Sequence, residues 1–112
     1  MAHIQHLAIR SKDPERLARY YERTFGWTRL STRPSGGVHL SDGHINLSIL
    51  NARDGDEGLE HFGVKLDSAD EIAAAASQAL GRDESGNAAE HRMTDPDGNM
   101  FDVSVKGFLD RA

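Results

Sequence analysis

The feature that most constrains this chain is an internal repeat. The segment that begins at Ile4 matches in kind the segment that begins 55 residues later at Leu59, and the match continues over more than about twenty positions. Apolar, histidine, small and basic residues fall at corresponding places in the two copies. Because 112 residues are too few for two independent domains, both copies must share one fold.

Each copy opens with a segment that has the pattern of a β-strand. Residues 4–10 and 59–66 alternate between apolar side chains and other residue types, which is the period of a strand with one buried face. His6 and His61 occupy the parity opposite to the apolar residues. We therefore expect both histidines to face away from the core.

A helix is expected after each of these strands. In the first copy Asp13 can cap a helix that Gly26 closes. In the second copy Ser68 and Glu71 have the spacing of a capping box, and Gly81 stands where Gly26 does. Apolar residues recur at helical spacing in both segments, so the repeat extends through two helices.

Short strands separated by turn residues follow each helix. Near the C-terminus the turn at residues 95–99 precedes the alternating segment 101–105, which corresponds to residues 45–49 in the first copy. Shifting the offset to 56 for one extra residue at this turn pairs Asp102 with Asn46. Asp102 then lies on the strand face that the two histidines share.

The repeated order predicts an α+β fold made of two βαβββ modules. The modules span about residues 1–52 and 58–108 of a single domain, 1–112. Residues 51–58 are rich in Asp, Gly and Glu and form the linker, and residues 81–87 form a second polar loop.

Composition excludes several classes of function. Asp and Glu (18) outnumber Lys and Arg (13), so nucleic acid is not an expected partner. No apolar run approaches the length of a membrane span, and the N-terminus lacks the apolar stretch of a signal peptide; we expect a cytoplasmic protein. With no cysteine, a metal would have to be held by imidazole, carboxylate, amide or water.

His6, His61 and Asp102 are the candidate metal ligands. Each lies on a different strand, on the face opposite the core. A repeat packed around a pseudo-two-fold axis would bring the two histidines together in a shared cleft. Two imidazoles and one carboxylate suit a divalent ion (Fe, Mn, Ni, Co or Zn) with positions left for substrate. The alternative is that each histidine is simply solvated or hydrogen-bonded, but their equivalence in the repeat favours the metal.

Other polar residues are candidates for contact with substrate. His39 is either a proton shuttle in the cleft or a polar residue at its rim. Asn46 and Ser48 share a strand face and are candidates to bind substrate. Arg10 and Lys65 share the parity of the histidines, so they either hold an anionic substrate or are exposed strand ends.

Three segments of the chain resemble the vicinal oxygen chelate superfamily, which includes glyoxalase I, extradiol dioxygenases, methylmalonyl-CoA epimerase, and fosfomycin and bleomycin resistance proteins. The segments are residues 4–9, 59–64 and 95–102. The resemblance implies a glyoxalase-like fold in which curled mixed sheets of two βαβββ modules form a metal cleft, with ligands on the first and last strands of the modules.

Two residues depart from the pattern of that superfamily. Members with four protein ligands have a Glu where the alignment places Asn46, and an amide cannot take a proton at neutral pH. Asp102 stands where the superfamily usually has Glu. These departures weaken an isomerase or epimerase assignment and leave a site of three ligands, as in the dioxygenase branch.

The sequence therefore predicts a metal-dependent enzyme in which the ion binds neighbouring oxygens of a small molecule, with lyase, isomerase or dioxygenase chemistry. One alternative is a metal-free module that sequesters a ligand, as bleomycin resistance proteins do. Another is a non-catalytic subunit of a larger complex. No glycine loop for an organic cofactor is present, and the resemblance implies a homodimer.

Overall fold

The computed structural model describes residues 2–78, 81–83 and 91–109. Within these residues the elements follow the order strand, helix and three strands twice. They are β1 (His3–Ser11), α1 (Pro14–Phe25), β2 (Thr28–Thr32), β3 (Val38–Ser41), β4 (Asn46–Asn51), β5 (Gly58–Lys65), α2 (Ala69–Gln78), β6 (Gly81–Asp83), β7 (His91–Thr94) and β8 (Met100–Ser104).

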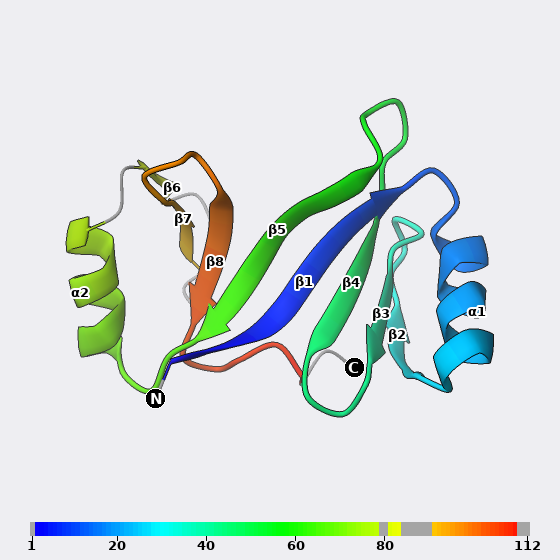
Figure 1. Ribbon diagram of the computed structural model, residues 1–112, viewed down its shortest axis with the longest axis horizontal. Coiled ribbons are helices and arrows are strands. Elements are labelled where there is room, and N and C mark those ends of the chain that lie inside the picture. Colours follow the sequence, from blue (N-terminus) through cyan, green and yellow to red (C-terminus); the bar gives the residue numbers. More distant parts are fainter. Residues whose placement is uncertain (1, 79–80, 84–90, 110–112) are drawn as a thin grey trace.

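The strands of the described residues form one sheet of eight, in the order β2-β3-β4-β1-β5-β8-β7-β6. In each module the first strand runs parallel to the last, β1 with β4 and β5 with β8. The modules join where β1 and β5 pair antiparallel. Figure 1 shows α1 and α2 at opposite ends of the molecule with the sheet between them. The predicted α+β architecture of two βαβββ modules is confirmed, and the two halves form a continuous sheet.

Both helices begin at the residues that the sequence indicates. The Asp13 side chain accepts from the backbone N–H of Arg16 at 3.1 Å, and Gly26 ends α1 with a left-handed φ of 71°. At the start of α2 the Ser68 hydroxyl accepts from the Glu71 N–H at 3.3 Å. These contacts satisfy N–H groups that the first turn of a helix otherwise leaves free.

Each helix covers the apolar face of its own module, so the protein has two apolar clusters. Under α1 the cluster contains Ala18, Val38, Leu40, Leu47 and Ile49. The cluster under α2 is smaller and contains Leu66, Met93 and Val103. The described residues of α2 include none that is fully buried. The second helix is therefore held by less buried apolar surface than the first.

The second module differs from the sequence prediction after α2. Within the described residues α2 extends to Gln78, and residues 81–83 are a strand, β6, paired with β7. The polar loop predicted there is therefore wrong for residues 81–83, while residues 84–87 lie outside the described residues. Among the described helices, none has the length and apolar character needed to cross a membrane.

Candidate metal centre

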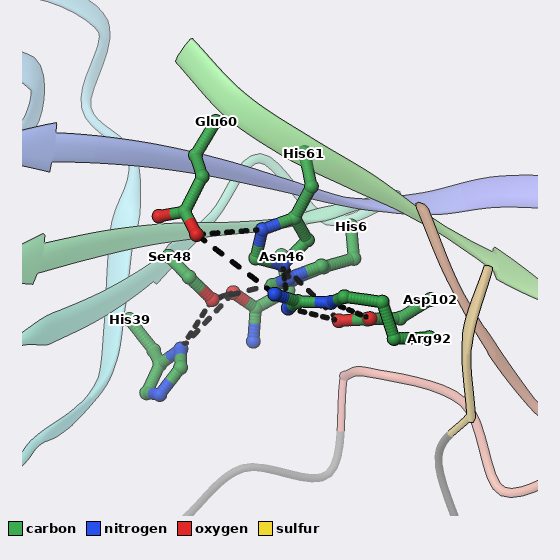
Figure 2. Close-up of polar contacts among 8 residues, drawn as sticks. All are labelled: His6, His39, Asn46, Ser48, Glu60, His61, Arg92 and Asp102. Atoms are coloured by element: carbon green, nitrogen blue, oxygen red, sulfur yellow. Dashed lines mark hydrogen bonds and ion pairs between the residues drawn. The ribbon is translucent and has the colours of Figure 1, made fainter. Parts of the chain in front are cut away.

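Three side chains from three strands meet on the face of the sheet opposite the helices. His6 on β1, His61 on β5 and Asp102 on β8 bring their ligand atoms within 4.8 Å of one another. The two Nε2 atoms of the histidines are 3.2 Å apart, and Nε2 of His61 is 3.1 Å from Oδ2 of Asp102. His6 and Asp102 are each 6% exposed. Figure 2 shows these side chains converging, so the three predicted ligands form one cluster.

Strand register places the cluster, and Gly63 leaves room for it. Gly63 pairs with His6 on one side and with Asp102 on the other. A Cβ at Gly63 would lie 2.7 Å from Cβ of His6 and 2.7 Å from Cζ of Phe108. Phe108 is fully buried and stacks on the imidazole of His6 at 4.7 Å. The glycine therefore allows an aromatic ring to pack against one of the candidate ligands.

A buried hydrogen-bond network determines which nitrogen of His6 carries its proton. The Asn46 amide donates to the Phe108 carbonyl at 2.7 Å, so its oxygen accepts from the Ser48 hydroxyl at 2.8 Å. With its single proton used, Ser48 Oγ accepts from Nδ1 of His6 at 3.2 Å and Nδ1 of His39 at 2.8 Å. In this arrangement the proton of His6 is on Nδ1, and its Nε2 lone pair faces His61.

His61 has one buried nitrogen without a hydrogen bond. Among the described residues, Nδ1 of His61 has no hydrogen-bond partner, and Oε1 of Glu60 is 3.7 Å away. Histidines that bind a metal through one nitrogen commonly direct the other N–H toward a carboxylate. If Nε2 of His61 holds a metal, the proton moves to Nδ1 and faces Glu60. The position of this otherwise unsatisfied atom fits a metal ligand.

The spacing of the donor atoms also fits a metal. An ion bound at about 2.1 Å keeps adjacent ligand atoms about 3.0–3.4 Å apart in octahedral or tetrahedral geometry. Two separations in the cluster, 3.1 Å from His61 to Asp102 and 3.2 Å from His6 to His61, fall in this range, and all three ligand atoms lie within 4.8 Å of one another. The residues present therefore fit a divalent ion.

Arg92 on β7 lies directly beside two of the three candidate ligands. Its Nε donates to Oδ1 of Asp102 at 2.9 Å, and its Nη2 lies 3.4 Å from both Oδ2 of Asp102 and Nε2 of His61. Burial raises the pKa of Asp102, but the hydrogen bonds and charges of His61 and Arg92 outweigh it and bring the pKa to about 2. Asp102 is therefore a carboxylate at neutral pH.

The register corrects the alignment of Asp102 with Asn46. Ala8 of β1 pairs with Ser48, and its counterpart in the repeat, Gly63, pairs with Asp102. Ser48 is thus the structural equivalent of Asp102, and the offset of 56 is wrong. In the first module the place of the carboxylate is taken by a hydroxyl that binds His6 through Nδ1. Within the described residues the cluster therefore offers three candidate ligands rather than four.

The other candidate residues of the first module are buried. Asn46 and Ser48 are 0% and 1% exposed, and His39 is 8% exposed. The two ring nitrogens of His39 lie against Ser48 and the guanidinium of Arg33, which donates to Nε2 at 3.2 Å. His39 is therefore part of the buried network and not a rim residue.

Arg10 and Lys65 do not lie together. They belong to opposite ends of the β1–β5 pair, where Arg10 is opposite Gly58 and Lys65 is opposite His3. Seven residues of strand separate the ends, about 23 Å at the rise of an antiparallel strand. Lys65 lies 4.0 Å from Asp67. The two residues therefore do not share one site, and contact of either with substrate stays a prediction.

Sequence reasoning missed three residues around the site: Glu60, Arg92 and Phe108. Phe108 lies beyond the last strand and Arg92 in a short segment whose inward face could not be assigned from the sequence. Glu60 has the parity of the core residues, but a register shift between Ala8 and Ile9 interrupts the ladder beside it. The repeat could have indicated Arg92, because it pairs with Asp102 as His39 pairs with Ser48.

A small pocket opens beside the cluster. Its volume is about 240 Å³, enough for a small molecule only. It is lined by Leu7, Leu59, Glu60, His61, Phe62, Asn99 and Met100. Of the three candidate ligands only His61 lines it, and Leu7 and Phe62 have the strand parity opposite to that of His6 and His61.

Comparison with protein families gives a match over most of the chain. Residues 6–104 match the family described as Glyoxalase-like domain. A comparison with curated proteins gives no match.

Several solved structures share the fold. The hypothetical protein BH1468 from Bacillus halodurans C-125 is 12% identical, with a TM-score of 0.69 over 92% of this chain and 93% of that chain. The 2,3-dioxygenase LapB from Pseudomonas sp. KL28 is 19% identical, with a TM-score of 0.69 over 96% of this chain but 42% of the dioxygenase. A Streptomyces coelicolor methylmalonyl-CoA epimerase in complex with 2-nitronate-propionyl-CoA is 18% identical, with a TM-score of 0.62 over 89% of this chain and 94% of the epimerase. At these identities the likeness is one of fold.

Proposed function

This chain belongs to the glyoxalase-like domain family, within the vicinal oxygen chelate superfamily, and we propose that it is a metal-dependent enzyme. In this proposal His6, His61 and Asp102 hold the divalent ion. The observation that carries it is the convergence of two Nε2 atoms and one carboxylate oxygen from three strands within 4.8 Å. A divalent ion held by these residues would act as a Lewis acid. It would bind two neighbouring oxygens of a small substrate and stabilise negative charge that develops on them.

The surrounding residues prepare the ligands for this role. Ser48 and His39 keep the proton of His6 on Nδ1, so that the lone pair of Nε2 can bind the ion. Glu60 lies where it can face a proton on Nδ1 of His61. His61 and Arg92 together lower the pKa of Asp102, so that it is ionised. The pocket that His61 lines offers apolar walls to a small molecule. His39 is then a positioning residue, since both its nitrogens have protein partners.

The reaction belongs to the lyase, isomerase or dioxygenase classes. Proteins of similar fold include a 2,3-dioxygenase and a methylmalonyl-CoA epimerase. Ser48 takes the place of a fourth ligand, which favours the classes that work with three protein ligands and leave more positions for substrate. The ligand set accommodates Fe, Mn, Ni, Co or Zn. A cytoplasmic location and a homodimer stay predictions from the sequence.

Metal content tests the proposal most directly. The parent protein and the His61→Ala variant are each exposed to the five metals and dialysed, and retained metal is measured by elemental analysis. The matched control is His44→Ala, which removes an exposed histidine outside the cluster. We expect about one ion per chain in the parent and the control and little in His61→Ala. No retained metal in the parent would overturn the proposal.

A second function, a metal-free binding module, is favoured by one observation. The guanidinium of Arg92 already supplies a positive charge to Asp102 and lies 3.4 Å from His61. In such a module this internal cation would take the place of the metal, and the pocket would bind a small apolar ligand unchanged. Absence of metal in the parent protein, combined with saturable binding of small aromatic molecules, would support this second function over the first.

A further inference from the structure

Arg92 contacts the atoms that the divalent ion would need. Its Nη2 lies 3.4 Å from Oδ2 of Asp102 and 3.4 Å from Nε2 of His61, and its Nε donates to the second oxygen of Asp102 at 2.9 Å. Figure 2 shows the guanidinium between Glu60 and Asp102, next to the imidazole of His61. Two of the three metal ligands therefore already face a positive charge from the chain itself.

We propose that Arg92 is an internal cation that competes with the divalent ion, so that the guanidinium must leave Asp102 and His61 when the ion binds. The inference rests on the proposed function, because it concerns the same three ligands. It goes further because it assigns to one residue, Arg92, the control of the metal affinity of this site.

Electrostatics supports competition between the two cations. A guanidinium and a divalent ion that share one carboxylate repel each other, and the repulsion is strong where water is largely excluded. Asp102 is only 6% exposed, so water screens the two charges poorly. Nη2 of Arg92 also lies 3.4 Å from Nε2 of His61, the atom through which His61 would bind the ion.

A second carboxylate lies ready to receive the displaced guanidinium. Nη1 of Arg92 is 3.9 Å from Oε1 of Glu60, whose side chain is 19% exposed. The side chain of Arg92 is 34% exposed, and its long, unbranched stem can change rotamer at small cost. Glu60 can therefore keep the guanidinium paired after it leaves Asp102, which makes the exchange between the two cations feasible.

If Arg92 instead supported metal binding, removing it would change the metal affinity in the opposite direction. Carboxylates that bind metals are commonly held by hydrogen bonds from neighbouring residues, and loss of such a partner weakens metal binding. If Arg92 only oriented Asp102 in this way, removing it would lower metal affinity. Competition requires that removing it raises the affinity, so one measurement separates the two roles.

The experiment measures zinc affinity by competition with a chromophoric chelator for the parent, Arg92→Gln and Arg23→Gln. Arg23 is exposed on α1 and serves as the matched control. We expect Arg92→Gln to bind zinc more tightly by at least about tenfold, the scale on which partners of metal ligands act, and Arg23→Gln to match the parent. Equal or weaker affinity in Arg92→Gln overturns the competition while the metal centre stands. If neither the parent nor Arg92→Gln binds zinc, both proposals are overturned. If Arg92→Gln binds zinc and the parent does not, the competition is supported.

A second measurement needs no variant of the site. NMR follows the Nε–H resonance of Arg92 in the parent protein as zinc is added. Arg29, whose Nε donates to Glu22 at 3.3 Å, is the internal control. We expect the Arg92 resonance to shift on loading and that of Arg29 to stay in place. An Arg92 resonance that does not change in zinc-loaded protein would show that the guanidinium keeps its contacts, and would refute the competition.

Discussion

The hydroxyl of Ser48 accepts a hydrogen bond from Nδ1–H of His6 at 3.2 Å, and this contact leaves the lone pair of the imidazole on Nε2, toward His61. The same hydroxyl accepts from Nδ1 of His39 and donates to Asn46. One buried oxygen thus forms hydrogen bonds with three polar side chains. The effect of removing it can be measured with or without metal.

The Ser48→Ala variant should bind metal less tightly than the parent, by about ten- to a hundredfold, because a ligand loses the partner that sets its tautomer. Nitrogen-detected NMR of the metal-free protein should show His6 protonated on Nδ1 in the parent and a mixture of tautomers in the variant. The control is Ser77→Ala on the exposed side of α2. A parent protein with His6 protonated on Nε2 would contradict the network described here.

The Gly63→Ala variant should lose stability and metal affinity together. The new Cβ would lie 2.7 Å from atoms of both His6 and Phe108, and such overpacking costs about 1–3 kcal/mol of unfolding free energy. Urea denaturation measures the loss. Gly98→Ala is the control, since its φ of 90° strains an alanine in an exposed turn remote from His6. The control should lose stability but keep its metal affinity; equal losses of affinity in both would show that the close approach at Gly63 does not matter.

Acid should remove a stabilising contact between α1 and β2. Hydrogen bonds from Arg29 and then Arg19 lower the pKa of Glu15 from 4.5 to about 2. A carboxyl with a lowered pKa in the folded protein stabilises the fold above the unfolded pKa, and this contribution is lost as the pH falls through the folded one. The parent should therefore lose more stability than Glu15→Gln between pH 4.5 and 2. Urea titrations at several pH values test this, with Asp56→Asn in the linker as control; parallel curves for the parent and Glu15→Gln would count against the contact.

Helix α2 should open more readily than α1. The described residues of α2 include none that is fully buried, whereas α1 buries Pro14 and Ala18. Local opening is easiest where few apolar contacts are lost. Native-state hydrogen exchange should show faster exchange for the amides of residues 72–78 than for those of residues 18–25. Equal protection of the two helices would mean that both modules open as one unit.

Much of the fold could be predicted because the repeat supplies the same information twice. Strand parity predicted that His6 and His61 share a face, and the caps at Asp13 and Ser68 predicted where the helices begin. The convergence of the histidines with Asp102 followed from these local patterns. Period and capping are local properties of the chain, so they can be read from the sequence.

The remaining features depend on register, which is not local. Pairing Asp102 with Asn46 assumed that turn lengths reveal the alignment, but the backbone pairs Asp102 with Gly63 and makes Ser48 its equivalent. Arg10 and Lys65 share a parity, yet the antiparallel pairing of their strands separates them. Phe108 lies beyond the last strand, and no period in the sequence indicates that it returns to His6.

Ser48 and Asp102 occupy equivalent backbone positions in the two modules. Two identical single modules paired through their first strands would place the same residue at both positions. They would thus have either two carboxylates or two hydroxyls beside the imidazoles. Joining the modules in one chain allows the two positions to differ, as Ser48 and Asp102 do, so that the two halves of the cluster need not be alike.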